Sequence, residues 1–251
     1  MDSCQSHPIC PDSGVLATTE LDSTPSTATK DPTKDAVDQL NIFDFDGTLF
    51  RSPEPNADKW TRASIATIKN GPKAKGLGWF QDVITLCPPY VPEIPGGDWW
   101  NGPLLCRVRE SMADPRSVTV LLTGRSESYR QRINAIVGSA ALVFDAVGLK
   151  PPSGPSTIDY KTQFIADLIA KHAPRQVNLW DDRVEQIKGF VAFLTAKKES
   201  SGIDFEVHRV EIPPVYLADN VETKLLDLLM AKHGRVNLVT RDDAAAHGIV
   251  L

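Results

Sequence analysis

Asp44 and Asp46 lie one residue apart at the end of a short apolar run, in a pattern well suited to chemistry. The mostly apolar residues 40–43 are typical of a buried strand, and Gly47 favours a break just after it. Residues two apart in a strand point the same way, so both carboxylates can reach one small site. Like charges that close share a proton or are neutralised by a cation, most naturally Mg²⁺. The pair therefore predicts a site with acid–base or metal chemistry, although Asp-x-Asp-Gly also suits an ordinary turn.

Three further polar segments follow at intervals along the chain. The first and third come directly after the strand-like runs 118–122 and 177–180, and the second lies in a helix-like stretch that opens near residue 158. Open α/β sheets form ligand crevices at the carboxyl ends of their strands, so these side chains are expected to meet. The residues concerned are Thr123, Gly124 and Arg125, then Lys161, then Asp181, Asp182 and Arg183.

The order of these motifs between residues 44 and 183 resembles the haloacid dehalogenase superfamily of phosphotransferases. A finer resemblance is to the haloacid dehalogenase-like domain of fungal Swiss Army Knife RNA repair proteins. That family more often shows Glu-Asp-Arg where this chain has Asp-Asp-Arg at 181–183, a change that shortens one carboxylate and keeps the chemistry possible. The finer resemblance is carried by the segments 46–53, 99–101, 121–128, 144–145, 148–151 and 156–157.

The resemblance implies a Mg²⁺-dependent phosphatase with two catalytic aspartates. Asp44 would attack phosphorus and carry an aspartyl-phosphate, while Asp46 would protonate the leaving group and then activate water. Mg²⁺ would bind the Asp44 carboxylate, the Asp46 backbone carbonyl, and Asp181 or Asp182. The alternative for the last two acids is that they only cap the helix that follows them.

The same resemblance assigns phosphoryl binding to Thr123 and Lys161, through a hydroxyl and an ammonium group. Gly124 would allow the backbone to approach the phosphoryl oxygens closely, and amides at the nearby helix start favour an anion. Taken without the other motifs, Lys161 would be interpreted as a solvated lysine of a first helical turn. Two interpretations stay open for Arg125 and Arg183, namely substrate contact or an ordinary surface or ion-pair role.

Composition limits which classes of binding partner the protein is expected to have and where in the cell it is expected to be. The 251 residues carry a formal net charge of −5 with a pI near 5.6, which gives no basic footprint for a long nucleic-acid interface. A single nucleotide end held by a few local cations is compatible with that charge. No run approaches about eighteen apolar residues, so no membrane span is expected, and the N-terminus lacks the pattern of a secretory signal. The expected location is cytoplasmic or nuclear.

Alternating strand-like and helix-like stretches predict an α/β fold with a Rossmann-like, doubly wound parallel sheet. Residues 1–37 are rich in Ser, Thr, Pro and Asp and are expected to be disordered, while 38–251 form the haloacid dehalogenase-like domain. Residues 236–239 are interpreted as a short extra strand or an ordered tail. Strands are expected at 40–45, 117–122, 143–147, 176–180 and 204–210, and helices at 103–113, 126–137, 161–172, 183–197 and 220–233.

An insertion at about 50–116 interrupts this alternation and is expected to be a loop-rich cap, the part of the superfamily that sets substrate choice. One interpretation of its tryptophans is that Trp99 or Trp100 stacks on a base. The favoured interpretation is that the tryptophans form the core of the cap and pack it on the sheet. The basic loop at 71–78 could contact phosphate, although charge on such a loop is usually only solvated.

The sequence therefore predicts a Mg²⁺-dependent phosphohydrolase that acts on a phosphorylated substrate. The resemblance indicates RNA or nucleotide ends, whereas the acidic charge mildly favours a small metabolite, and the residues do not decide between them. The alternative from another class is a non-catalytic protein that keeps the fold for binding or as a scaffold. The presence of Asp44, Asp46, Thr123 and Lys161 argues against a scaffold.

Overall fold

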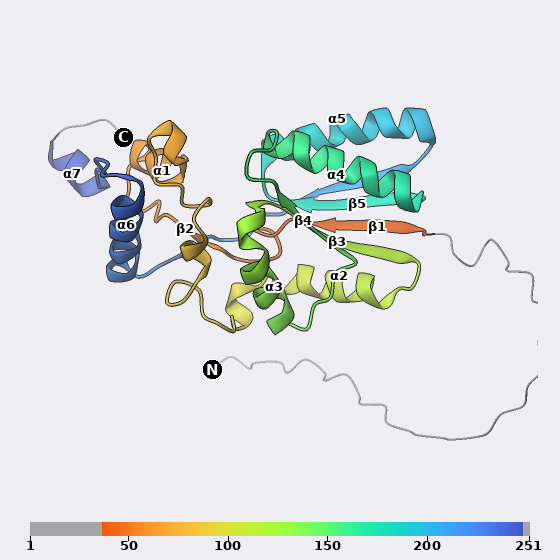
Figure 1. Cartoon of the computed structure of the whole chain (residues 1–251), viewed down its shortest axis with the longest axis horizontal. Coiled ribbons are helices and arrows are strands. Elements are labelled where there is room, and N and C mark those ends of the chain that lie inside the picture. Colours follow the sequence, from red (N-terminus) through yellow and green to blue (C-terminus); the bar gives the residue numbers. More distant parts are fainter. Residues whose placement is uncertain (1–36, 248–251) are drawn as a thin grey trace, which may run out of the picture. The chain divides into compact units, whose positions relative to one another are not determined.

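Five parallel strands form the central sheet of the computed structural model, which describes residues 37–247. Their order is β4-β3-β1-β5-β6, so the strand that leads to the aspartate pair lies in the centre (Figure 1). From β1 the chain winds outward to both sides, which confirms the predicted doubly wound α/β fold. The disorder expected for residues 1–37 falls, up to residue 36, outside the described residues. The strands are β1 Gln39–Phe43, β3 Ser117–Ser126, β4 Ala146–Lys150, β5 Gln176–Asp181 and β6 Asp204–Arg209.

Helices cover both faces of this sheet because alternate residues of each strand point to opposite sides. Leu40 and Ile42 of β1 pack in one apolar cluster with α4 (Thr157–His172) and α5 (Val184–Ser201). Phe43 packs in a second cluster with α2 (Gly102–Ala113) and α3 (Arg130–Ser139) on the other face (Figure 1). The sheet is thus clamped between two apolar layers, which fixes the strand ends that carry the polar motifs.

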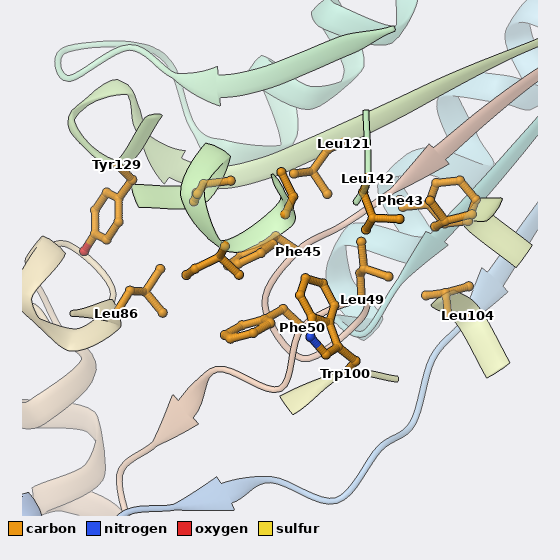
Figure 2. Close-up of a cluster of buried hydrophobic side chains, with 14 of the residues drawn as sticks. Phe43, Phe45, Leu49, Phe50, Leu86, Trp100, Leu104, Leu121, Tyr129 and Leu142 are labelled. Atoms are coloured by element: carbon orange, nitrogen blue, oxygen red, sulfur yellow. The ribbon is translucent and has the colours of Figure 1, made fainter. Parts of the chain in front are cut away.

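Trp99 and Trp100 belong to the second of these clusters and do not face the predicted site. The Trp100 ring is buried and meets Phe50 edge-on with ring centroids 5.1 Å apart, and Trp99 stacks on Phe50 at 5.9 Å. Figure 2 shows Trp100 beside Phe50 and Leu49 within the apolar cluster. These contacts support the packing interpretation of the two tryptophans over base stacking.

The cap is made from two distant parts of the chain. Trp60, Ile68 and Trp79 of the insertion share an apolar cluster with Leu225 and Leu229 near the C-terminus. The helix expected at 220–233 therefore packs in the cap and not against the sheet, a difference that helical periodicity alone does not reveal. The cap elements are β2 Pro53–Glu54, α1 Arg62–Lys69, β7 Val215–Tyr216, α6 Asp219–His233 and α7 Arg241–Ala246, with β2 and β7 paired in parallel.

Several element boundaries differ from the sequence-based expectation. Strand β4 begins three residues later than expected, and Val143 in the expected strand is exposed. Helix α4 begins earlier because the Ser156 hydroxyl accepts from the amide of Asp159 and caps it. Residues 236–239 form no strand, so the ordered-tail interpretation holds for them. Short 3₁₀ turns lie at Pro72–Ala74, Val83–Leu86, Gly97–Trp99 and Glu127–Tyr129. None of the described helices is long and apolar enough to cross a bilayer.

Candidate active site

The carboxyl ends of β1, β3 and β5 bring most of the predicted residues to one place. Phe43 of β1 is in register with Leu121 of β3 and with Trp180 of β5. Asp44 follows β1, and Asp181 ends β5, so neighbouring parallel strands deliver both carboxylates to the same edge. The predicted order of motifs thus becomes a cluster at the centre of the sheet.

Lys161, from the first turns of α4, reaches into this cluster and is fully enclosed. Its ammonium donates to Asp44 Oδ1 at 2.7 Å and to Asp181 Oδ2 at 2.7 Å, and the side chain is only 2% exposed. Burial opposes its charge, but the two carboxylates outweigh burial and raise the pKa of Lys161 above its ordinary value. Lys161 is therefore a fixed cation, with one of its three donors left for a further oxygen.

Three carboxylates lie close enough to share one cation. Oxygen atoms of Asp44, Asp181 and Asp182 lie within 4.8 Å of one another. Burial, reinforced by neighbouring carboxylates and opposed by Lys161, raises the pKa of Asp44 to about 7. Burial and the charge of Asp181 likewise raise the pKa of Asp182 to about 6, and its Oδ1 is buried with no partner among the described residues. Three clustered carboxylates with only one ammonium between them, and with one oxygen unpartnered among the described residues, fit a divalent cation such as Mg²⁺.

The Asp46 side chain turns away from this carboxylate cluster and pairs with Arg125 of β3. Arg125 donates from Nη2 to Asp46 Oδ1 at 2.7 Å and from Nε to Oδ2 at 3.0 Å, and Ser52 donates to Oδ1 at 2.6 Å. Burial opposes ionisation, yet the guanidinium outweighs it and holds the pKa of Asp46 below its usual range. Of the two interpretations of Arg125, the structure supports a buried ion pair.

Thr123 and Gly124 lie on β3 beside this ion pair. The Thr123 hydroxyl is fully buried, accepts from the Arg125 amide at 3.1 Å and lies 3.5 Å from Asp46 Oδ2. Gly124 is exposed, and a Cβ at this position would approach Thr157 Cγ2 to 2.8 Å. Gly124 thus keeps the backbone open at the site, while the Thr123 hydroxyl is oriented toward Asp46.

A small hollow of about 120 Å³ opens over these groups and includes residues that sequence reasoning missed. Asp44, Lys161 and Gly124 line its floor, together with Phe80 of the cap and Gln186 of α5. Gln186 is 8% exposed, and its Oε1 has no partner among the described residues. Gln186 lies in the first turn of α5, just after the acidic pair, and that position could have indicated it, whereas nothing in the loop sequence singled out Phe80.

The Phe80 ring lies over the site, and three cationic side chains contact it. The guanidinium carbons of Arg125 and Arg183 lie 4.9 and 5.9 Å from its centroid, and the Lys69 ammonium lies 5.6 Å from it. Such cation–π contacts attract the cap loop to the sheet edge. Arg183 itself is exposed at the mouth of the hollow, so it is available to an incoming ligand.

Gly47 closes the turn after the aspartate pair, and its substitution by alanine is expected to disturb the site. Gly47 has φ +68°, and an added Cβ would lie 2.8 Å from Asp182 Oδ2. We expect Gly47→Ala to lower the free energy of unfolding by about 1–2 kcal/mol from the left-handed backbone alone, with a further loss from the contact with Asp182. Denaturant unfolding would measure both.

The matched control is Gly202→Ala, because Gly202 has φ +72° and no atom of the described residues lies within 4 Å of an added Cβ. Its loss of stability reports the backbone strain without a steric contact. An equal loss in the two variants would show that Gly47 and Asp182 do not crowd each other.

Known proteins show similarity at the level of sequence and of fold. Residues 52–235 match the sequence model described as HAD domain family 1 in Swiss Army Knife RNA repair proteins. The match includes Thr123, Lys161, Asp181 and Asp182, and it begins after Asp44. An uncharacterized protein of Saccharomyces cerevisiae is 28% identical over 175 residues, which cover 63% of this chain. The chain spans only 37% of the length of that relative.

Solved structures give weaker likenesses. The Pnkp1/Rnl/Hen1 RNA repair complex matches 73% of this chain and 45% of its own chain with 14% identity and a TM-score of 0.42. The HAD domain of the effector protein Lem4 from Legionella pneumophila matches over 80% of this chain and 100% of its own, with 11% identity and a TM-score of 0.45. A HAD-superfamily hydrolase of Geobacter sulfurreducens matches over 77% and 97%, with 15% identity and a TM-score of 0.38.

Proposed function

Because the chain belongs to HAD domain family 1 of the Swiss Army Knife RNA repair proteins, we propose that it is a Mg²⁺-dependent phosphohydrolase that forms an aspartyl-phosphate. The observation that carries the proposal is the cluster of buried Asp44 and Asp181 and half-buried Asp182 at the ends of neighbouring strands, with Lys161 of α4 enclosed between the first two. A scaffold protein has no need to bury two carboxylates around one lysine with a third carboxylate beside them. Such a cluster suits a nucleophile that must approach an anionic phosphate.

In the first half-reaction, Asp44 attacks phosphorus. An Oδ atom of Asp44 forms a bond to phosphorus as the bond from phosphorus to the leaving oxygen breaks, which yields the aspartyl-phosphate and the departing alcohol. Lys161, fixed by Asp44 and Asp181, offers its remaining donor to a phosphoryl oxygen. Gly124 lets the backbone approach the phosphoryl group from the β3 side.

In the second half-reaction, Asp46 is placed to act on water. The ion pair with Arg125 keeps Asp46 ionised, so this carboxylate can accept the proton of a water that attacks the aspartyl-phosphate. That attack breaks the bond between phosphorus and the Asp44 oxygen and releases phosphate. In the first half-reaction, protonated Asp46 donates its proton to the leaving oxygen, and the Arg125 charge stabilises the carboxylate that remains and that acts as the base here.

Asp44, Asp181 and Asp182 are the groups that would hold Mg²⁺ in this proposal. When bound, Mg²⁺ would neutralise the carboxylates and the phosphoryl oxygens and so favour the approach of two anions. The unpartnered Oδ1 makes Asp182 the stronger candidate for a direct ligand, because Asp181 already accepts from Lys161 at 2.7 Å. The backbone carbonyl of Asp46 is the fourth group that we assign to the cation.

We extend the proposal to phosphate ends of RNA or of nucleotides as the substrate. Its support is the family's place among RNA repair proteins. The test is release of phosphate from a 3′-phosphorylated RNA oligonucleotide, measured with Mg²⁺ and again with EDTA. Release that needs Mg²⁺ is the expected result. Hydrolysis of other phosphomonoesters without hydrolysis of this RNA would refute the 3′-phosphate RNA end as a substrate and leave the phosphatase chemistry in place.

Mg²⁺ is also expected to raise the melting temperature of the protein through the carboxylate cluster. At about 100 times its dissociation constant, a ligand of the native state adds about 2.7 kcal/mol, or roughly 5–10 °C for a domain of this size. Asp182→Asn should remove most of the shift, whereas Asp167→Asn on the exposed face of α4 should keep it. A wild-type protein without a shift, or an Asp182→Asn protein that keeps all of it, would contradict the assignment.

A further inference from the structure

A second, larger groove continues from the active site toward the cap, and apart from Asp182 at its inner end its lining has no part in the chemistry described above. It has a volume of about 380 Å³ and runs from Gly47 and Asp182 to the segment that ends at Tyr216. Between it and the hollow over Asp44 lies an intermediate hollow, also of about 380 Å³. Each hollow shares lining residues with the next, so the three lie in a row from Lys161 outward.

The position of Asp46 indicates which hollow holds the phosphoryl group and which holds the leaving group. Asp44 and Lys161 line the inner hollow and not the intermediate one, whereas Asp46 lines both. A phosphoryl group attacked by Asp44 therefore lies in the inner hollow, and the leaving oxygen, next to Asp46, points into the intermediate hollow. Phe80 lines both hollows and so lies at the point where the leaving group passes from one to the other.

The described residues that line the outer groove are polar and apolar in similar measure, and they form no stripe of positive charge. Lys69 pairs with Glu54, and Arg209 pairs with Glu211 at 2.8 Å. Arg51 donates to the carbonyls of Asp98 at 2.9 Å and of Pro213 at 3.3 Å. A bound nucleic-acid strand needs cations for each phosphate that it places on a protein. This groove therefore suits an uncharged group and not the repeated charges of an RNA backbone.

The other residues that line the outer groove suit the base and the ribose of a nucleoside. Tyr216 lies in the groove with the apolar side chains of Ile65 and Pro214, a surface on which a base can stack. Glu54 offers a carboxylate of the kind that accepts from ribose hydroxyls. The volume lies within the range of pockets that bind small molecules.

We propose that the outer groove is the leaving-group subsite of the active site and that it takes one nucleoside, so that only the terminal nucleotide of a substrate is recognised. This inference rests on the proposed phosphohydrolase function and narrows it. The base stacks on Tyr216, the ribose hydroxyls donate to Glu54, and any longer strand leaves the protein after that nucleotide.

The test compares kcat/KM for substrates of increasing length. These are p-nitrophenyl phosphate, nucleoside 3′- and 5′-monophosphates, and 3′- and 5′-phosphorylated ribonucleotides of two and ten residues, with a phosphotyrosine peptide as the non-nucleotide comparison. The expected result is a rise from p-nitrophenyl phosphate to the better mononucleotide and no further rise with length. The dependence of kcat/KM on salt should be the same for one and for ten residues, because no additional phosphates are bound.

Variants of the groove supply the second readout. Tyr216→Ala is expected to lower the ratio of kcat/KM for the mononucleotide to that for p-nitrophenyl phosphate by about tenfold, because base stacking is lost. Tyr216→Phe retains the ring and should retain the ratio. Glu54→Gln should also lower the ratio, whereas Glu110→Gln on the exposed face of α2 should not.

The outcomes separate this inference from the proposed function. A kcat/KM that increases with every added nucleotide would overturn the inference in favour of a bound strand. A phosphotyrosine peptide that is hydrolysed better than any nucleotide, or a ratio unaffected by Tyr216→Ala, would overturn it while phosphatase activity remains. No hydrolysis of any substrate, including p-nitrophenyl phosphate, would refute the phosphohydrolase itself and the inference with it.

Discussion

Asp44→Asn is expected to lower phosphate release by about 10⁴-fold or more, since loss of a covalent nucleophile in enzymes has effects of this size. The amide of asparagine cannot form the acyl-phosphate bond, so neither half-reaction can proceed through this side chain. The amide oxygen can still accept from Lys161, whose ammonium lies 2.7 Å from Asp44 Oδ1 and keeps its second partner, Asp181. We therefore expect the variant to remain folded and to lose activity alone.

The measurement is phosphate release from the 3′-phosphorylated RNA under single-turnover conditions, followed by acid quenching to detect phosphate bound to the protein. The wild type should yield labelled protein and Asp44→Asn should not. Asp227→Asn is the matched control, because it makes the same chemical change on the exposed face of α6. Activity of Asp44→Asn within about a hundredfold of the wild type would exclude Asp44 as the nucleophile.

The sequence predicted the residues of the carboxylate cluster because strand ends are local features. The apolar runs before Asp44 and Asp181 each form a buried strand, and parallel pairing with β1 at the centre places both acids at one edge. Lys161 was found by its order in the chain, and its enclosure between two carboxylates follows from the start of α4 at the Ser156 cap. For these three residues, the order of motifs in the sequence predicted side chains that do contact one another in the structure.

Arg125 and Phe80 show what the sequence could not predict. The pairing of Arg125 with Asp46 depends on β3 continuing to Ser126, four residues beyond the expected end of that strand. Phe80 lies in a loop without periodicity, and its place over the site depends on how the cap packs on α6. Two-residue strands such as β2 and β7 leave no alternation in the sequence at all. Long-range packing decides each of these features.

Arg125 contacts side chains of both the cap and the sheet region, in addition to its ion pair with Asp46. Arg125 also donates to the Thr85 hydroxyl at 3.2 Å and lies over the rings of Phe80 and Tyr129 at 4.9 and 4.8 Å. A single guanidinium thus joins the aspartate loop, the cap and the start of α3. The roof of the site is therefore fixed by the same group that sets the ionisation of Asp46.

Arg125→Met is accordingly expected to lower the free energy of unfolding by about 3–5 kcal/mol, because it leaves the carboxylate of Asp46 buried and unpaired. Asp46 is 9% exposed and Arg125 2%, so water cannot replace the lost charge. The pKa of Asp46 should rise once the guanidinium is gone, since burial alone favours the protonated form. Denaturant unfolding measures the loss of stability. The pH dependence of kcat/KM in Arg125→Met reports the rise in the pKa of Asp46, and Arg125→Lys, which keeps the charge, is the comparison.

The double variant Arg125→Met/Asp46→Asn distinguishes the ion pair from the packing. If the loss in Arg125→Met comes from an unpaired charge, removing that charge should restore much of the stability, and the coupling energy between the two positions should be large. If the loss comes from the contacts with Phe80, Tyr129 and Thr85, the double variant should be no more stable than Arg125→Met. Additive losses would mean that the cap is held by packing on the guanidinium. A large coupling would mean that the charge of the aspartate loop itself holds the cap in place over the site.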